Sequence, residues 1–138
     1  MKTRVHYVSP KGSAEQLAEI IARTCECVKE PLLPAYMPEN ITLMFLGCEG
    51  NKPDKVTMEF INVMNSERVR NVALFSCTGG SGEPIEQMKK ALKSRGVNVL
   101  DKTLTAPVKG LFGGGPKESD LAAAKQFAQD CMDAVEGE

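Results

Sequence analysis

The stretch of sequence at residues 5–15 reads VHYVSPKGSAE, and it carries the clearest signal of the fold. Its first part, Val5–Val8, combines β-branched and aromatic side chains, which predicts a short strand. A turn containing proline and glycine interrupts this strand. A helix is predicted to begin at Ser13, because Ser13 and Gln16 have the spacing of a capping box. The stretch therefore predicts a strand that leads through a short turn directly into a helix.

The same alternation of strand and helix continues along the chain. Nearly continuous apolar runs predict strands at Ile41–Leu46 and Val72–Phe75, a pattern typical of strands buried on both faces of a parallel sheet. A weaker pattern, flanked by Pro31 and Pro34, predicts a strand around Cys27–Leu32, and Val97–Leu104 is predicted to be the last strand. Apolar residues at helical spacing predict the helices: Leu17, Ile20 and Ile21; Phe60, Ile61 and Met64 within Val56–Met64; Ile85, Met88 and Leu92; and Leu121, Ala124, Ala128, Cys131 and Val135.

Strands and helices in alternation predict a three-layer, doubly wound α/β sandwich around a five-stranded parallel sheet. The chain has 138 residues, which is the length of one domain, and we expect residues 1–138 to form it. In doubly wound sheets, ligands bind outside the carboxyl ends of the strands, where the strand order reverses. The loops after the predicted strands are therefore candidate ligand-binding segments.

Composition narrows the classes of function. The chain is 42% hydrophobic and 25% charged, as in ordinary soluble globular proteins. Its formal net charge of -1 argues against nucleic acid or an anionic membrane as a partner. We expect a cytoplasmic protein, because the sequence has neither an apolar run long enough to span a membrane nor a signal peptide. Five cysteines, an odd number, favour reduced thiols over a disulfide framework.

The turn at residues 9–13 has the parts of an anion-binding loop. Free backbone N–H groups and the dipole at a helix N-terminus favour a phosphate. Ser9 and Ser13 offer hydroxyl donors, and Lys11 offers a positive charge. The alternative is a plain strand-to-helix turn with a good N-cap, and helix-terminus physics does not decide between the two.

The chain resembles the flavodoxin family, whose first loop reads hydroxyl-x-Thr-Gly-x-Thr-Glu. Ser9, Gly12 and Glu15 match this loop, whereas Lys11 and Ala14 replace two threonines that in the family donate to the phosphate of flavin mononucleotide (FMN). Further similarity lies in Leu43–Gly50, Val72–Gly82 and the segments 110–112 and 120–128. The resemblance implies FMN as the cofactor and a strand order of 2-1-3-4-5.

The two later loops depart from the family pattern. Flavodoxins usually place the flavin ring between aromatic side chains from these loops, but residues 48–53 and 77–82 contain no Trp or Tyr, and the whole chain has no Trp. Their glycines instead allow the backbone to approach a planar ring closely. The residues expected to contact FMN are Ser9, Lys11, Gly12, Ser13, Ala14, Glu49, Gly50, Asn51, Cys77, Thr78, Gly79, Gly80 and Gly82.

Two cysteines and one acid near this predicted pocket have alternative roles. Cys48 and Cys77 follow neighbouring strands, so they form either a thiol pair near the flavin or, as we favour, small packing residues. Glu49 either contacts the flavin edge or is solvated, and we favour solvation. Cys25 and Cys27 lack the further ligands that a zinc site requires, so no metal site is expected.

The leading hypothesis is an FMN-binding redox protein that exchanges electrons with a partner protein or a small acceptor, as a monomer or a homodimer. Its flavin performs the chemistry, so no catalytic acid or base is expected, and whether the protein is an enzyme stays open. The alternative is a flavodoxin-fold interaction module that has lost FMN. A phosphoacceptor receiver and a cysteine phosphatase are disfavoured, because the first strand carries no carboxylate and the first loop carries Ser9 instead of a cysteine.

Overall fold

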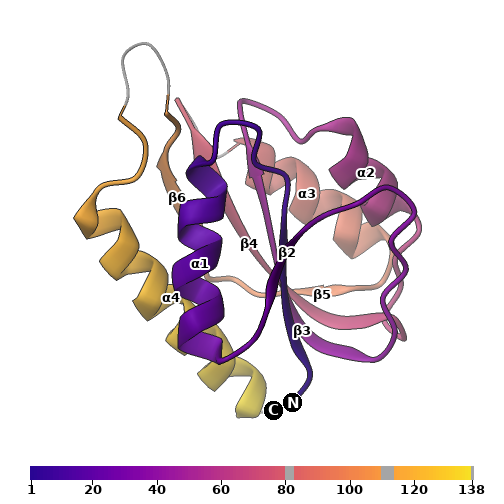
Figure 1. The fold of residues 1–138 in the computed structure, drawn as a ribbon. Helices are drawn as coiled ribbons and strands as arrows, with labels where there is room; N and C mark the ends of the chain where they lie inside the picture. The colour runs from indigo at the N-terminus through magenta and orange to yellow at the C-terminus, as the bar shows by residue number, and fades with distance from the viewer. Residues whose placement is uncertain (80–82, 110–113, 138) are drawn as a thin grey trace.

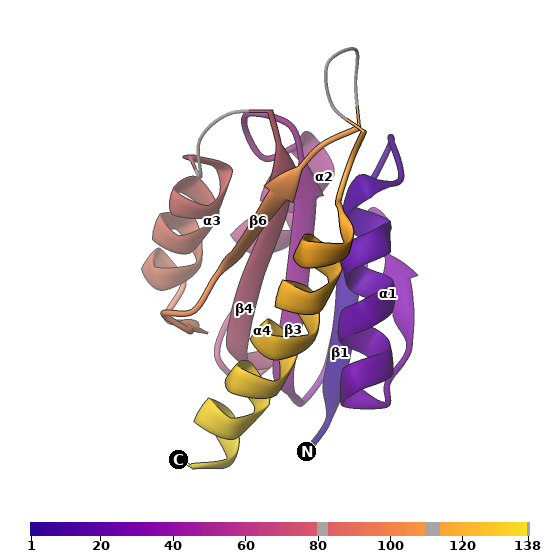
Figure 2. The same ribbon diagram turned by 90° about the vertical axis from the view of Figure 1, so that its left-hand side faces the viewer.

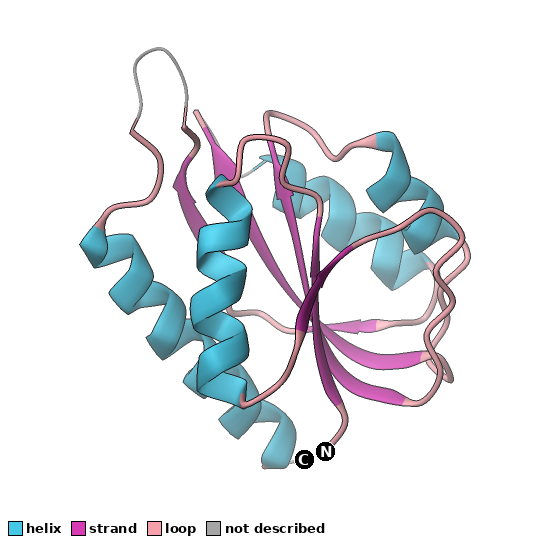
Figure 3. Ribbon diagram, viewed as in Figure 1, coloured by secondary structure: helices cyan, strands magenta, loops and turns pink. Residues whose placement is uncertain are grey.

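The computed structural model describes residues 1–79, 83–109 and 114–137 (Figure 1, Figure 3). In chain order the elements are β1 (Thr3–Tyr7), α1 (Ser13–Cys25), β2 (Lys29–Pro31), β3 (Ile41–Glu49), α2 (Lys55–Asn62), β4 (Val69–Thr78), α3 (Glu83–Ser94), β5 (Asn98–Val99), β6 (Leu104–Pro107) and α4 (Glu118–Glu136). Strands and helices alternate as predicted except at two places, where one strand follows another without a helix between them: β3 after β2, and β6 after β5.

The strands form one parallel sheet in the order β2-β1-β3-β4-β5, and β6 also pairs with β4. This confirms the predicted fold class and strand order. The strand predicted at Val97–Leu104 is instead divided between β5 and β6, which pair with successive parts of β4. The exposed polar residues 101–103 separate the two pieces, because they interrupt the apolar pattern that a buried strand needs.

The helices cover both faces of the sheet, as a parallel sheet requires (Figure 1, Figure 2). Helices α1 and α4 lie on one face, and α2 and α3 lie on the other. Side chains of β3 alternate between the two layers, since successive residues of a strand point to opposite faces. Phe45 belongs to the core under α1 and α4, whereas Met44 and Leu46 belong to the core under α2 and α3.

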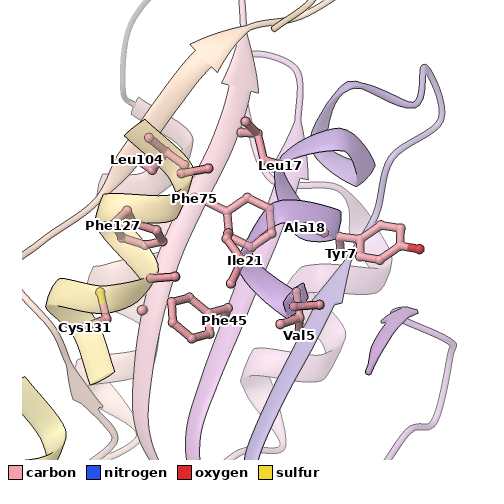
Figure 4. Packing of buried hydrophobic residues seen from close by; sticks show 14 of the residues in the cluster. Val5, Tyr7, Leu17, Ala18, Ile21, Phe45, Phe75, Leu104, Phe127 and Cys131 are labelled. Atoms are coloured by element: carbon pink, nitrogen blue, oxygen red, sulfur yellow. The ribbon is translucent and has the colours of Figure 1, made fainter. Parts of the chain in front are cut away.

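The core under α1 and α4 is built around large aromatic side chains (Figure 4). Phe45, Phe75 and Phe127 are all buried, and the rings of Phe45 and Phe127 meet edge to face with centroids 5.6 Å apart. Leu17 and Ile21 of α1 pack against them. Fully burying each such side chain contributes about 1.5–3 kcal/mol, so this layer holds α1 firmly against the sheet.

The start of α1 differs from the sequence prediction. Its N-cap is Gly12, in the left-handed conformation with a φ of 80°, and no side chain caps the helix. The predicted capping box of Ser13 and Gln16 is therefore wrong. The buried Ser13 hydroxyl oxygen accepts a hydrogen bond from the backbone N–H of Lys109, 2.8 Å away and 96 residues later, a long-range contact that local spacing does not reveal.

Candidate functional site

The carboxyl ends of β1, β3 and β4 lie at one edge of the sheet, because parallel strands end on the same side (Figure 1). Strand order places β3 between β1 and β4. The backbone N–H of Val8 donates to the carbonyl of Gly47 over 3.1 Å, so β1 and β3 stay paired up to the loops. This arrangement brings residues 9–15 next to Glu49, the last residue of β3.

Three hydrogen-bond donors of the first loop converge on the carboxylate of Glu49. Ser9 Oγ donates to Oε2 over 2.5 Å, and the backbone N–H of Ala14 donates to the same oxygen over 2.8 Å. The backbone N–H of Lys11 donates to Oε1 over 2.8 Å. We call this set of three donors, Ser9 Oγ, Lys11 N and Ala14 N, the anion cradle.

The turn at residues 9–12 gives the anion cradle its shape. The N–H of Gly12 donates to the carbonyl of Ser9 over 3.1 Å, and the positive φ of Gly12 turns the chain into α1. Ser9 Oγ also accepts a hydrogen bond from the N–H of Glu15 over 3.0 Å, which orients its own proton toward Glu49. The donors thus come from the start of the loop after β1, from the turn itself and from the first turn of α1.

The anion cradle is chemically suited to an oxyanion. The first N–H groups of a helix have no carbonyl partner within the helix, and the helix dipole adds positive potential there. Hydrogen bonds from such donors to a charged acceptor are worth about 1.5–3 kcal/mol each. In this structure the oxyanion is the carboxylate of Glu49, so the interpretation of Glu49 as a solvated acid is wrong.

The structure brings some of the predicted phosphate-loop residues together and not others. Ser9, Lys11 and Ala14 contribute the three donors. The side chain of Lys11 is exposed, and Lys11 contacts Glu49 through its backbone N–H instead of its ammonium group. The hydroxyl of Ser13 lies against Lys109 and not in the anion cradle.

The described residues of the two predicted ring-binding loops are joined to each other next to Glu49. The N–H of Gly50 donates to the carbonyl of Cys77 over 2.9 Å, and Thr78 Oγ1 donates to Asn51 Oδ1 over 3.3 Å. Gly79 is exposed at the end of β4. The remaining two predicted contacts, Gly80 and Gly82, lie outside the described residues.

Cys48 and Cys77 point to opposite faces of the sheet. Cys48 packs in the core under α2 and α3, whereas Cys77 packs in the core under α1 and α4, so a thiol pair between them is wrong. Burial raises the pKa of each thiol to about 12, with nearby carboxylates adding to the effect. The structure instead supports the interpretation of Cys48 and Cys77 as small packing residues. Cys77 contacts the loop after β3 through its backbone carbonyl, which accepts a hydrogen bond from Gly50.

Thiol titration tests this placement. Cys48, Cys77 and Cys131 are buried and their thiols have pKa values raised to about 12, whereas Cys25 and Cys27 are half-buried. A hydrogen bond between the latter two thiols lowers the pKa of Cys27. A disulfide reagent at neutral pH is expected to modify Cys27 first and to reach the three buried thiols only in denaturant. Rapid modification of Cys48 or Cys77 in the folded protein, located by mass spectrometry, would contradict the structure.

Tyr7, Glu15 and Lys29 form a hydrogen-bonded cluster beside the first turn of α1, which the sequence pattern did not predict. Glu15 Oε2 accepts hydrogen bonds from Tyr7 Oη over 3.0 Å and from Lys29 Nζ over 3.1 Å. These bonds lower the pKa of Glu15, the Lys29 bond contributing most, and they direct its carboxylate toward β2 instead of the anion cradle. No local pattern reveals this cluster, because its members come from β1, α1 and β2.

Solved structures with the same fold include several flavodoxins. An archaeal flavodoxin is similar over 99% of both chains, with a TM-score of 0.75 and 20% identity. Oxidised Flavodoxin 2 from Bacillus cereus is similar over 97% of this chain and 99% of its own, with a TM-score of 0.73 and 15% identity. The two-electron reduced flavodoxin of Megasphaera elsdenii covers 92% of this chain and 98% of its own, with a TM-score of 0.60 and 21% identity.

The chain matches no protein-family model. It also matches no curated protein sequence. At these identities the structural similarity establishes the architecture: the chain has the flavodoxin-like fold. Within residues 1–79, 83–109 and 114–137, no helix is long and apolar enough to cross a membrane. The same residues contain no cluster of three or more His, Cys, Asp or Glu side chains that could hold a metal ion.

Proposed function

We propose that this protein binds FMN and exchanges electrons with a partner protein or a small electron acceptor. The observation that carries the proposal is the anion cradle, in which two backbone N–H groups and one hydroxyl meet on a single oxyanion. A phosphate monoester presents the same kind of acceptor oxygens, and helix N-termini at this edge of a doubly wound sheet favour it.

The residues present fit the two parts of FMN differently. Ser9, Lys11 and Ala14 would hold the phosphate through the donors that Glu49 occupies in this structure. Gly50, Asn51, Thr78 and Gly79 would flank the ring, whose contacts would be made by backbone and small polar groups in place of aromatic stacking. When bound, FMN supplies reversible electron transfer, and the protein supplies binding and orientation.

Further features agree with a redox carrier. The flavodoxin-like fold extends over nearly the whole chain, as in the solved flavodoxins. We infer a cytoplasmic protein that acts as a monomer or a homodimer. Its redox partner would dock near Gly79, which is exposed just after β4. Neither nucleic acid nor a membrane is expected as a partner, given the net charge of -1.

Equilibrium titration with FMN tests the proposed function. Adding the protein is expected to quench FMN fluorescence saturably, with one flavin bound per chain. Riboflavin, which lacks the phosphate, is expected to bind at least about tenfold more weakly, because it makes no charge-assisted hydrogen bonds in the anion cradle. Unquenched FMN across the whole titration would remove the proposal, and equal affinity for both flavins would remove the assigned phosphate site.

One observation favours a second function, that of an interaction module without flavin. The carboxylate of Glu49 accepts a hydrogen bond from each of the three donors of the anion cradle. In a protein that has lost FMN, this carboxylate would take the place of the FMN phosphate and keep the three donors hydrogen-bonded. The same titration separates the two functions, since the interaction module binds neither FMN nor riboflavin.

A further inference from the structure

We propose that Glu49 is a built-in competitor for the anion cradle, so that a phosphate group enters only when the Glu49 carboxylate leaves. The inference rests on the proposed function for the identity of the natural ligand. It goes beyond that function because it assigns Glu49 a regulatory role instead of a contact with the flavin.

The competition follows from the hydrogen-bond inventory. The backbone N–H groups of Lys11 and Ala14 have one proton each, and both protons are directed at Glu49. Ser9 Oγ also has one proton and likewise donates it to Glu49. A phosphate oxygen in the anion cradle would take these protons and would lie in contact with a second negative charge. The two anions therefore exclude each other sterically and electrostatically.

The side chain of Glu49 is placed so that it can move without disturbing the sheet. Its backbone is paired with Cys77 of β4, and the next residue, Gly50, is tied to the carbonyl of Cys77. The residue is only half-buried at the carboxyl end of β3, so rotation about its side-chain bonds leads to solvent. A released carboxylate is thus hydrated instead of stranded in the core.

The consequence is a lowered apparent affinity for any phosphate ligand. When only a fraction of molecules has an open cradle, the measured dissociation constant rises by the inverse of that fraction. The two equilibria are linked reciprocally. Phosphate binding displaces the Glu49 carboxylate from the anion cradle, and displacement of the carboxylate raises the affinity for phosphate. Anything that draws Glu49 away, such as a cationic partner at this edge, would favour ligand binding.

The decisive variant is Glu49→Gln, which keeps the size of the side chain and removes its charge. Inorganic phosphate and, separately, FMN are titrated into the ¹⁵N-labelled wild-type and variant proteins, and the amide resonances of Lys11 and Ala14 are followed. The variant is expected to bind inorganic phosphate at least about tenfold more tightly than the wild type. Equal or weaker phosphate binding by the folded variant, or no binding by either protein, would overturn the proposal.

Glu19→Gln is the matched control. It removes the same charge from α1, but the Glu19 carboxylate pairs with Arg23 over 2.9 Å and with Lys29 over 3.8 Å, away from the anion cradle. Its phosphate affinity is expected to stay within about twofold of wild type, since exposed charges act weakly on one another. An increase equal to that of Glu49→Gln would overturn direct competition, because a general effect of net charge would then account for both.

A measurement on the wild type keeps the proposal testable if Glu49→Gln does not fold. The ¹³C resonance of the Glu49 carboxyl carbon is expected to move toward that of a solvated glutamate as phosphate saturates the Lys11 and Ala14 amides. An unchanged carboxyl resonance at saturation would overturn the proposal. Tighter phosphate binding by Glu49→Gln with no binding of either flavin would leave the competition standing while removing the proposed FMN function.

Discussion

Gly47→Ala is expected to lower the free energy of unfolding by about 1–3 kcal/mol, the cost of overpacking a well-packed core. An added methyl group at Gly47 would overlap the ring of Phe75, the residue that faces it across the β3–β4 pair. Phe75 is fully buried among the side chains under α1 and α4, so its ring has no free space to enter (Figure 4). Urea unfolding followed by circular dichroism measures the change.

A double-mutant cycle gives this prediction its control. Phe75→Leu shortens the side chain that the new methyl group meets, at its own cost in buried apolar surface. The double variant Gly47→Ala/Phe75→Leu is expected to be more stable than the sum of the two single changes predicts, because the two sites are in direct contact. Strict additivity would show that the cost of Gly47→Ala does not come from the ring of Phe75.

Gly12→Asp is expected to weaken FMN binding by about 2 kcal/mol, or roughly thirtyfold, provided that the proposed function holds. Gly12 lies between the two backbone donors of the anion cradle, and an added Cβ there meets no atom within 4 Å. The aspartate side chain therefore has room, and its negative charge repels the phosphate. Fluorescence titration with FMN on the folded variant measures the loss.

The control for Gly12→Asp is Gly12→Asn. Both variants place a branched polar side chain on a residue with a φ of +80°, and Asp and Asn both tolerate this left-handed conformation. The asparagine variant carries the same backbone strain without the charge, so it is expected to keep most of the affinity. Equal losses in the two variants would assign the effect to backbone geometry, and unchanged affinity in both would refute the phosphate assignment of the loop.

The sequence predicted the architecture well, because its signals are local. Ile41–Leu46 is a nearly continuous apolar run because β3 is covered on both faces by helices, and Val72–Phe75 within β4 is apolar for the same reason. The last predicted strand was less accurate: residues 101–103 are polar and exposed, yet the apolar residues on both sides suggested one continuous strand.

The candidate site was predicted only in outline. The loop at residues 9–15 was located correctly at the end of β1, and Ser9, Lys11 and Ala14 do supply donors there. The directions of side chains were less predictable. Ser13 was expected to cap α1 and to face an anion, but it is buried against Lys109, whose approach depends on where the chain lies almost a hundred residues later.

The prediction for Cys48 and Cys77 shows a related limit. Both were expected just after neighbouring strands. They lie instead within the carboxyl ends of β3 and β4, so their placement near one edge of the sheet was right. Whether they meet depends on register, because a shift of one residue moves a side chain to the other face. In the structure Cys77 is paired with Glu49, so the two thiols lie on opposite faces.

Composition and periodicity by themselves determined that this chain forms a parallel sheet with helices on both faces, and turn chemistry located a strand-to-helix turn after the first strand. Those properties arise from contacts between residues close in sequence and from the burial that each segment requires. Only the tertiary structure decided what fills the anion cradle. Glu49 is separated from Ser9 by 40 residues, and the pairing of β1 with β3 brings its carboxylate to the three donors of the first loop. The loop that resembles a phosphate site is thus also one that an internal carboxylate can close.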